Sequence, residues 1–207
     1  MEIELKYSIP NKEVEQAIWE NELYGLCEEK GSREELYLNA KYFDTENADL
    51  AKNKIAYRVR MEGDSPVATL KWKGYSEDGL HIREELNVPA NDLDPVPEIF
   101  RESTMGSQFA DLVKDKELKC IMETKIYRKQ FRIDTGEGIY EFSIDRGEII
   151  TDCGSIPISE LEIELYSGDT SEIRRVGEKI QKKYGLEVEN KSKYTRGMEL
   201  IKTGGTI

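Results

Sequence analysis

The chain has 207 residues, which is enough for one large β-rich domain with a substantial core. Its formal net charge of −12 argues against a general nucleic-acid binder, because such proteins usually carry a basic domain. Three widely spaced cysteines without a CxxC pair, no signal peptide and no long apolar run favour a cytoplasmic protein with reduced thiols and no membrane partner.

The chain opens with a predicted strand, EIELKY, at residues 2–7. Glu2, Glu4 and Lys6 share one face of this strand, because successive side chains of a strand point to opposite faces. The apolar residues between them form the other face. One face of the first strand is therefore charged with both signs, and the opposite face is apolar.

Helical periodicity predicts the next element. Apolar residues at helical spacing indicate a helix over residues 11–24, from an N-cap at Asn11 to Gly25. One or two further helical turns are expected around Leu50. Three more strands with alternating charges then follow: IAYRVRM (55–61), TLKWK (69–73) and HIREEL (81–86).

The segment NVPANDLDPVPE at residues 87–98 holds three of the six prolines and could be a domain linker. We expect instead a connection within one barrel, because charged strands lie on both sides of it and neither half alone could close a sheet. Residues 1–207 are thus expected to form a single domain. The remaining predicted elements are short helices within 100–113, charged strands at 123–131, 140–145 and 160–165, and a helix at 171–184.

The charged strand faces have two interpretations. Each face, taken alone, is typical of the solvent side of an ordinary antiparallel sheet. Solvent faces normally include Thr, Ser, Gln and Asn, however, whereas nearly every polar-face position in six segments here is ionised. If the charged faces curl inward, the apolar faces point outward and the predicted helices can cover them. The accumulated pattern favours this second interpretation.

A face with both signs of charge suits a metal-bound polyphosphate. Carboxylates supply the oxygen ligands that hard cations prefer, and guanidinium and ammonium groups bind phosphate oxygens. The negative net charge does not exclude such a site, because local charges and a bound divalent ion determine the potential in a cleft.

The order of motifs along the chain resembles the CYTH, or triphosphate tunnel metalloenzyme, family. The motifs are EIELK (2–6), YFDT (42–45), YRVR (57–60), ATLK (68–71), GLHIREEL (79–86), ETKIYRKQF (123–131), FSIDRGEI (142–149), ISELEIELYSGD (158–169) and ENKSKYTRG (189–197). The chain most resembles the bacterial inorganic triphosphatase branch, and we expect the tunnel alone, without a CHAD domain. The resemblance implies a β-dominated α+β fold, a closed eight-stranded antiparallel tunnel with a charged bore and helices packed outside.

The resemblance also implies roles for individual charged residues. The carboxylates expected to bind Mg²⁺ or Mn²⁺, directly or through water, are Glu2, Glu4, Glu85, Asp145, Glu162 and Glu164. The basic residues expected to bind phosphate are Lys6, Arg58, Arg60, Lys71, Arg83, Arg128 and Lys193, and Lys73 joins them because it shares the Lys71 face. Glu4, Glu164, Lys6 and Arg60 are expected to act most directly in catalysis.

Several residues depart from the family pattern or invite another interpretation. Gln130 stands where the triphosphatase branch tends to carry a second arginine, and Arg132 could supply that phosphate contact. Lys125 and Lys129 lie on the opposite face of the same strand and are expected to be solvated. His81, the single histidine, is expected at the surface, with a general-base role as the alternative.

The expected activity is divalent-metal-dependent hydrolysis of a linear triphosphate, foremost inorganic tripolyphosphate, with release of orthophosphate. The same tunnel is compatible with thiamine triphosphatase or class IV-type adenylate cyclase activity. A non-catalytic polyphosphate or nucleotide-binding module is a third alternative, which the retained carboxylates speak against. The expected partner is a small-molecule triphosphate, and a homodimer is compatible with the sequence.

Overall fold

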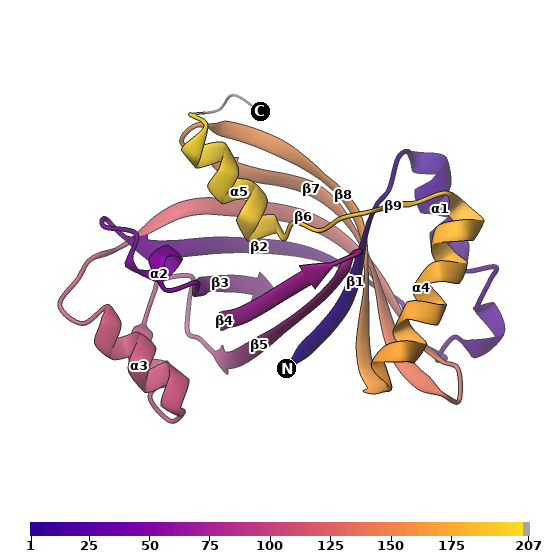
Figure 1. Ribbon diagram of the computed structural model, residues 1–207, viewed down its shortest axis with the longest axis horizontal. Helices are drawn as coiled ribbons and strands as arrows, with labels where there is room; N and C mark the ends of the chain where they lie inside the picture. Colours follow the sequence, from indigo (N-terminus) through magenta and orange to yellow (C-terminus); the bar gives the residue numbers. More distant parts are fainter. Residues whose placement is uncertain (205–207) are drawn as a thin grey trace.

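A closed antiparallel sheet forms the centre of the computed structural model, which describes residues 1–204 (Figure 1). Its strands are β1 (Glu2–Ser8), β2 (Glu34–Thr45), β3 (Ala56–Glu62), β4 (Ser65–Glu77), β5 (Leu80–Pro89), β6 (Leu118–Asp134), β7 (Gly138–Thr151) and β8 (Gly154–Gly168). They neighbour one another in the order β5-β4-β3-β2-β6-β7-β8-β1, and pairing of β1 with β5 closes the ring. The predicted eight-stranded barrel is confirmed, and a short β9 (Glu187–Val188) pairs with the end of β1.

Four of the five α-helices described within residues 1–204 lie between strands in the chain, and the fifth follows the last strand. The helices are α1 (Lys12–Glu20), α2 (Asp49–Lys52), α3 (Thr104–Leu112), α4 (Thr170–Tyr184) and α5 (Lys193–Lys202), with 3₁₀ turns η1 (Gly25–Cys27) and η2 (Pro97–Phe100). Asn11 caps α1 as predicted, but the helix ends at Asn21, which is left-handed with φ of 52°. The end predicted at Gly25 is therefore wrong. None of the helices within residues 1–204 is long and apolar enough to cross a membrane.

Two helix groups cover the outer, apolar faces of the strands. Figure 1 shows α1 and α4 together on one side of the barrel and α2 and α3 on the other. Leu5 of β1 and Phe142 of β7 pack with Ile173 of α4 in one buried cluster. Tyr57 of β3 packs with Phe109 of α3 in a second, where the ring centroids are 5.0 Å apart. The charged faces of the strands are thereby left to point into the barrel.

Helix α5 was not predicted, and it packs against the inward side of the barrel. It begins after the N-cap Ser192, whose side chain accepts a hydrogen bond from the Thr195 amide. Gly197 meets Met122 of β6 and Ile149 of β7. Met122 and Ile149 belong to a third buried cluster on the inner faces of β2, β6, β7 and β8. Part of the barrel interior is therefore apolar and filled by a helix, and the remainder is the charged cavity.

The Pro-rich segment 87–98 begins in β5 and ends in η2. Its Val96 amide donates a 3.0 Å hydrogen bond to the Tyr57 hydroxyl, which attaches the segment to β3. Strands from before and after the segment pair directly, β2 with β6 and β1 with β8. The segment thus connects strands of one sheet.

Replacing Gly197 with alanine tests the packing of α5. A Cβ at this position would overlap the Met122 sulfur and lie 3.1 Å from Ile149 Cγ2, so we expect overpacking to lower the free energy of unfolding by about 1–3 kcal/mol. Gly25→Ala is the control, because no atom lies within 4 Å of a Cβ there. Urea unfolding measures both variants, and equal stabilities would contradict the inward position of α5.

Candidate active site

A cavity of about 720 Å³ occupies the charged part of the barrel interior. All eight basic residues predicted to bind phosphate line it: Lys6, Arg58, Arg60, Lys71, Lys73, Arg83, Arg128 and Lys193. Five of the six predicted metal-binding carboxylates line it too: Glu2, Glu4, Glu85, Glu162 and Glu164. Strand alternation brought these residues into one space, as the charge pattern indicated, except for Lys193, which begins α5. Lys54, which follows α2, also lines the cavity and was not predicted.

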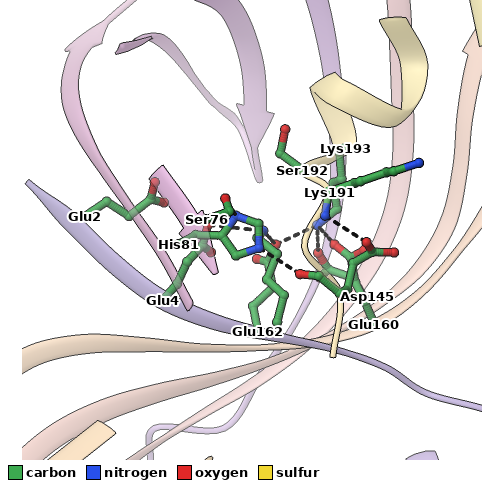
Figure 2. A network of polar contacts seen from close by, with 12 residues as sticks. Glu2, Glu4, Ser76, His81, Asp145, Glu160, Glu162, Lys191, Ser192 and Lys193 are labelled. Atoms are coloured by element: carbon green, nitrogen blue, oxygen red, sulfur yellow. Dashed lines mark hydrogen bonds and ion pairs between the residues drawn. The ribbon is translucent and has the colours of Figure 1, made fainter. Parts of the chain in front are cut away.

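The sixth carboxylate, Asp145, is fully buried in a cluster with Glu160 and Glu162 (Figure 2). Oxygen atoms of the three side chains lie within 4.8 Å of one another. Lys193 Nζ lies 2.8 Å from both Asp145 Oδ2 and Glu162 Oε1 and also contacts Glu160. Arg128 donates 2.7 Å bonds to both Asp145 oxygens and to Glu162. The cluster has the spacing of metal ligands, but basic side chains already balance its charge.

Basic neighbours stabilise the charges of Asp145 and Glu162, whereas burial raises the pKa of Glu160. Burial disfavours the charge of Glu162, but Lys193, Lys6 and Arg128 outweigh burial and hold the pKa of that carboxyl well below its usual value. Glu160 was not among the predicted site residues, although it has the same parity as Glu162 in ELEIEL. Arg196 of α5, at 3.0 Å from Glu160, also belongs to the cluster. The cluster thus joins β7 and β8 to α5.

A second group of carboxylates, Glu2, Glu4 and Glu164, is not balanced in the same way. Glu4 lies directly opposite Glu164 in the pairing of β1 with β8. Glu2 contacts Lys71 Nζ at 2.8 and 2.9 Å, and Glu4 contacts Lys6 Nζ at 3.2 Å. Burial, Glu2 and Glu4 together raise the pKa of Glu164 to about 7. We call these three residues the acidic patch, and its mutual repulsion makes it a place for a cation.

Basic residues repel one another in a different part of the cavity. Burial and the neighbouring Arg58 and Arg128 lower the pKa of Arg60. Arg58 Nε is buried and has no hydrogen-bond partner within residues 1–204. Burial would raise the pKa of Tyr42, but Arg58 outweighs it and the pKa is lowered. We call Arg58, Arg60 and Arg128 the basic patch, and its potential suits an anion.

Glu85 and Lys73, two of the predicted site residues, belong to neither the acidic nor the basic patch. Lys71 Nζ lies 2.6 Å from Glu85 Oε2, and although burial opposes it, Lys71 and Arg58 lower the pKa of Glu85 to about 2. Lys73 is exposed, with a left-handed φ of 53°, at an irregularity between β4 and β5. Glu85 thus balances basic residues, and Lys73 reaches the cavity from its exposed border.

The structure corrects three expectations. His81 is not at the surface, because only 1% of it is exposed, and it shares the inward parity of Arg83. Arg132 does not line the cavity and instead lies 3.4 Å from Glu141. Lys129 points out of the barrel as predicted, but it is not solvated, since it contacts Glu15 of α1 at 3.6 Å.

Comparison with known proteins agrees with this geometry. A family model described as CYTH domain matches residues 1–198. The inorganic triphosphatase of Haemophilus influenzae is 29% identical over 167 residues, which are 78% of this chain and 45% of the relative. The chain therefore spans less than half the length of that relative.

Two solved structures share the fold. The putative adenylyl cyclase HpAC1 from Hippeastrum, described as having a dominant triphosphatase activity, superposes with a TM-score of 0.71 at 20% identity, covering 100% of this chain and 98% of its own. A putative adenylate cyclase from Bacillus halodurans superposes with a TM-score of 0.59 at 20% identity, covering 95% and 96%. At these identities the likeness establishes the fold.

The acidic patch predicts a pH-dependent effect on stability without metal. Glu164 binds its proton more tightly in the folded chain than in the unfolded chain, so the stability it contributes below pH about 4.5 is lost as the pH rises to about 7. In EDTA at pH 8, Glu164→Gln should therefore be more stable than the wild type by about 1–3 kcal/mol. The difference should vanish toward pH 4.

Glu162→Gln is the matched control on the same face of β8. The pKa of Glu162 is lowered, so its charge stabilises the folded chain at neutral pH and the variant should be less stable there. Thermal unfolding across pH measures both variants. Effects of the same sign would contradict the separation of the two carboxylate groups.

Proposed function

The chain belongs to the CYTH domain family, and we propose that it hydrolyses linear triphosphates with a divalent metal ion. The observation that carries the proposal is one cavity in which neighbouring carboxylates repel Glu164 and neighbouring guanidinium groups repel Arg60. A metal-bound triphosphate has the charges that would relieve both repulsions. The name of the Haemophilus relative, inorganic triphosphatase, supports the same substrate class.

The acidic patch is the better candidate for the metal site. Glu164 faces the cavity, and the repulsion from Glu2 and Glu4 that raises its pKa is what a bound cation would remove. Three carboxylates are the hard oxygen donors that Mg²⁺ and Mn²⁺ prefer. The ion would supply charge neutralisation at the phosphate oxygens and a more acidic water.

The balanced cluster has a different role in this proposal. Asp145 and Glu162 hold Arg128 and Lys193 by several short contacts, so their oxygens are engaged before any ligand enters. Glu85 holds Lys71 in the same way. These carboxylates fix the positions of phosphate-binding groups, which is how charged groups are preorganised for a transition state.

The reaction needs no covalent intermediate with the protein. A carboxylate of the acidic patch, Glu4 or Glu164, orients a water molecule toward the terminal phosphorus. The new bond from this water to phosphorus forms as the bridging P–O bond breaks, and orthophosphate and diphosphate result. Arg58, Arg60 and Arg128 stabilise the charge on the phosphate oxygens during transfer.

Arg58→Ala and Lys129→Ala form a pair that tests the inward side of the barrel. Arg58 lines the cavity without a partner for its Nε, so its loss should cost about 2–4 kcal/mol of transition-state stabilisation in kcat/KM. Lys129 contacts α1 outside the barrel and should leave kcat/KM unchanged. Phosphate-release kinetics measure both, and equal losses would reject this assignment.

Inorganic tripolyphosphate should be the preferred substrate over ATP. Basic residues line the cavity from several strands and can engage every phosphate of a short chain. Trp72 also borders the cavity, but it packs against the outer core. We expect kcat/KM for tripolyphosphate to exceed that for ATP at least about tenfold, or about 1.4 kcal/mol.

A phosphate-release panel with tripolyphosphate, thiamine triphosphate and ATP, each with Mg²⁺ and Mn²⁺, tests this preference together with a cyclic-AMP assay. EDTA should abolish activity. Robust cyclic-AMP formation, or faster turnover of thiamine triphosphate, would replace the assignment. Absence of any turnover would favour a binding module.

A further inference from the structure

His81, drawn in Figure 2, is buried beside the cavity. It makes three polar contacts. Its Nδ1 lies 3.1 Å from Arg83 Nη2 and 2.8 Å from Ser76 Oγ. Its Nε2 lies 2.8 Å from the Glu189 carbonyl oxygen. Arg83 lines the cavity, whereas His81 does not. The imidazole therefore connects a residue of the cavity wall to the segment between β9 and α5.

The partners of His81 determine where its proton lies. A guanidinium nitrogen only donates hydrogen bonds, and a carbonyl oxygen only accepts them. Nε2 therefore carries the proton and donates to Glu189, while Nδ1 accepts from Arg83. The ring is neutral in this arrangement, and burial together with Lys6 lowers the pKa of His81 in agreement with it.

We propose that His81 is a positioning residue that holds the Arg83 guanidinium toward the cavity through Nδ1. The inference rests on the proposed function, in which Arg83 binds phosphate. The other partners of Arg83 are more distant, since Glu2 Oε2 and Glu4 Oε1 each lie 3.4 Å away. Both belong to the acidic patch, so a bound cation would compete with Arg83 for them.

A neutral acceptor suits this position better than a carboxylate. Nδ1 fixes the direction of the guanidinium but does not cancel its charge, so the full charge remains for phosphate. The ring itself is anchored from its other side, because the Glu189 amide donates a 2.9 Å bond to the Lys6 carbonyl. His81 thereby links Arg83, through Glu189, to the backbone of β1.

Two substitutions separate the contacts of the ring. In His81→Asn, the amide oxygen can take the place of Nδ1 and accept from Arg83, while the bond to Glu189 is lost. In His81→Gln, the amide nitrogen can take the place of Nε2 and donate to Glu189, while the bond to Arg83 is lost. A role limited to structure affects both variants alike.

We expect His81→Asn to keep kcat/KM for tripolyphosphate within about threefold of the wild type, and His81→Gln to lose about tenfold. In an Arg83→Ala background, His81→Gln should have no further effect, because the two residues act as one unit. Ser76→Ala removes the other partner of Nδ1 and is the control, with kcat/KM unchanged. Equal losses for Asn and Gln, or independent losses at residues 81 and 83, would overturn the proposal.

Nitrogen NMR of the imidazole provides a readout without turnover. His81 is the single histidine of the chain, so its ring signals need no further assignment. We expect the Nε2–H tautomer, and an Nδ1 shift that changes in Arg83→Ala but not in Lys129→Ala. The Nδ1–H tautomer, or an Nδ1 shift unaffected by Arg83→Ala, would reject the proposal even if the His81 variants do not fold. Failure of the wild type to hydrolyse tripolyphosphate would reject the proposed function alone.

Discussion

The burial of many charges inside one barrel is the constraint on which the rest of this structure depends. A charge moved from water into a protein interior is costly unless another charge or a ligand compensates it. The barrel meets this constraint in two ways. Asp145 and Glu162 are compensated within the chain by Lys193 and Arg128. Glu164 of the acidic patch and Arg60 of the basic patch are repelled by their neighbours, and a cation and an anion bound in the cavity would compensate them.

The outer layer follows from the same constraint. Strands whose inner faces are ionised have their apolar faces outside, so helices must cover those faces to form a core. Helix α4 does so closely enough that Gly177 faces Leu5 and Tyr7 of β1, where a side chain would not fit. Hydrophobic packing outside therefore stabilises strands whose inner faces contribute electrostatic strain. Hydrophobic packing and ligand binding therefore use opposite faces of the same strands.

Period-two alternation predicted much of this from the sequence, because it depends only on neighbouring residues in one strand. It placed Arg58, Lys71 and Glu164 on the inner face, and the structure finds all three there. It could not predict α5, whose residues face the barrel only through contacts with distant strands. His81 and Glu160 had the correct parity, but whether an inward residue lines the cavity or is covered depends on the layers around it.

The two kinds of compensation decide what a substitution can reveal. Lys193 contacts three buried carboxylates, so its removal leaves them unbalanced and changes folding as well as binding. Loss of activity at Lys193 cannot therefore be attributed to phosphate alone. Although burial opposes it, Tyr42 and Glu85 raise the pKa of Arg58. Its Nε has no hydrogen-bond partner within residues 1–204, and removal of Arg58 relieves repulsion on Arg60. Substitution of Arg58 therefore tests ligand binding, whereas substitution of Lys193 also tests the stability of the barrel.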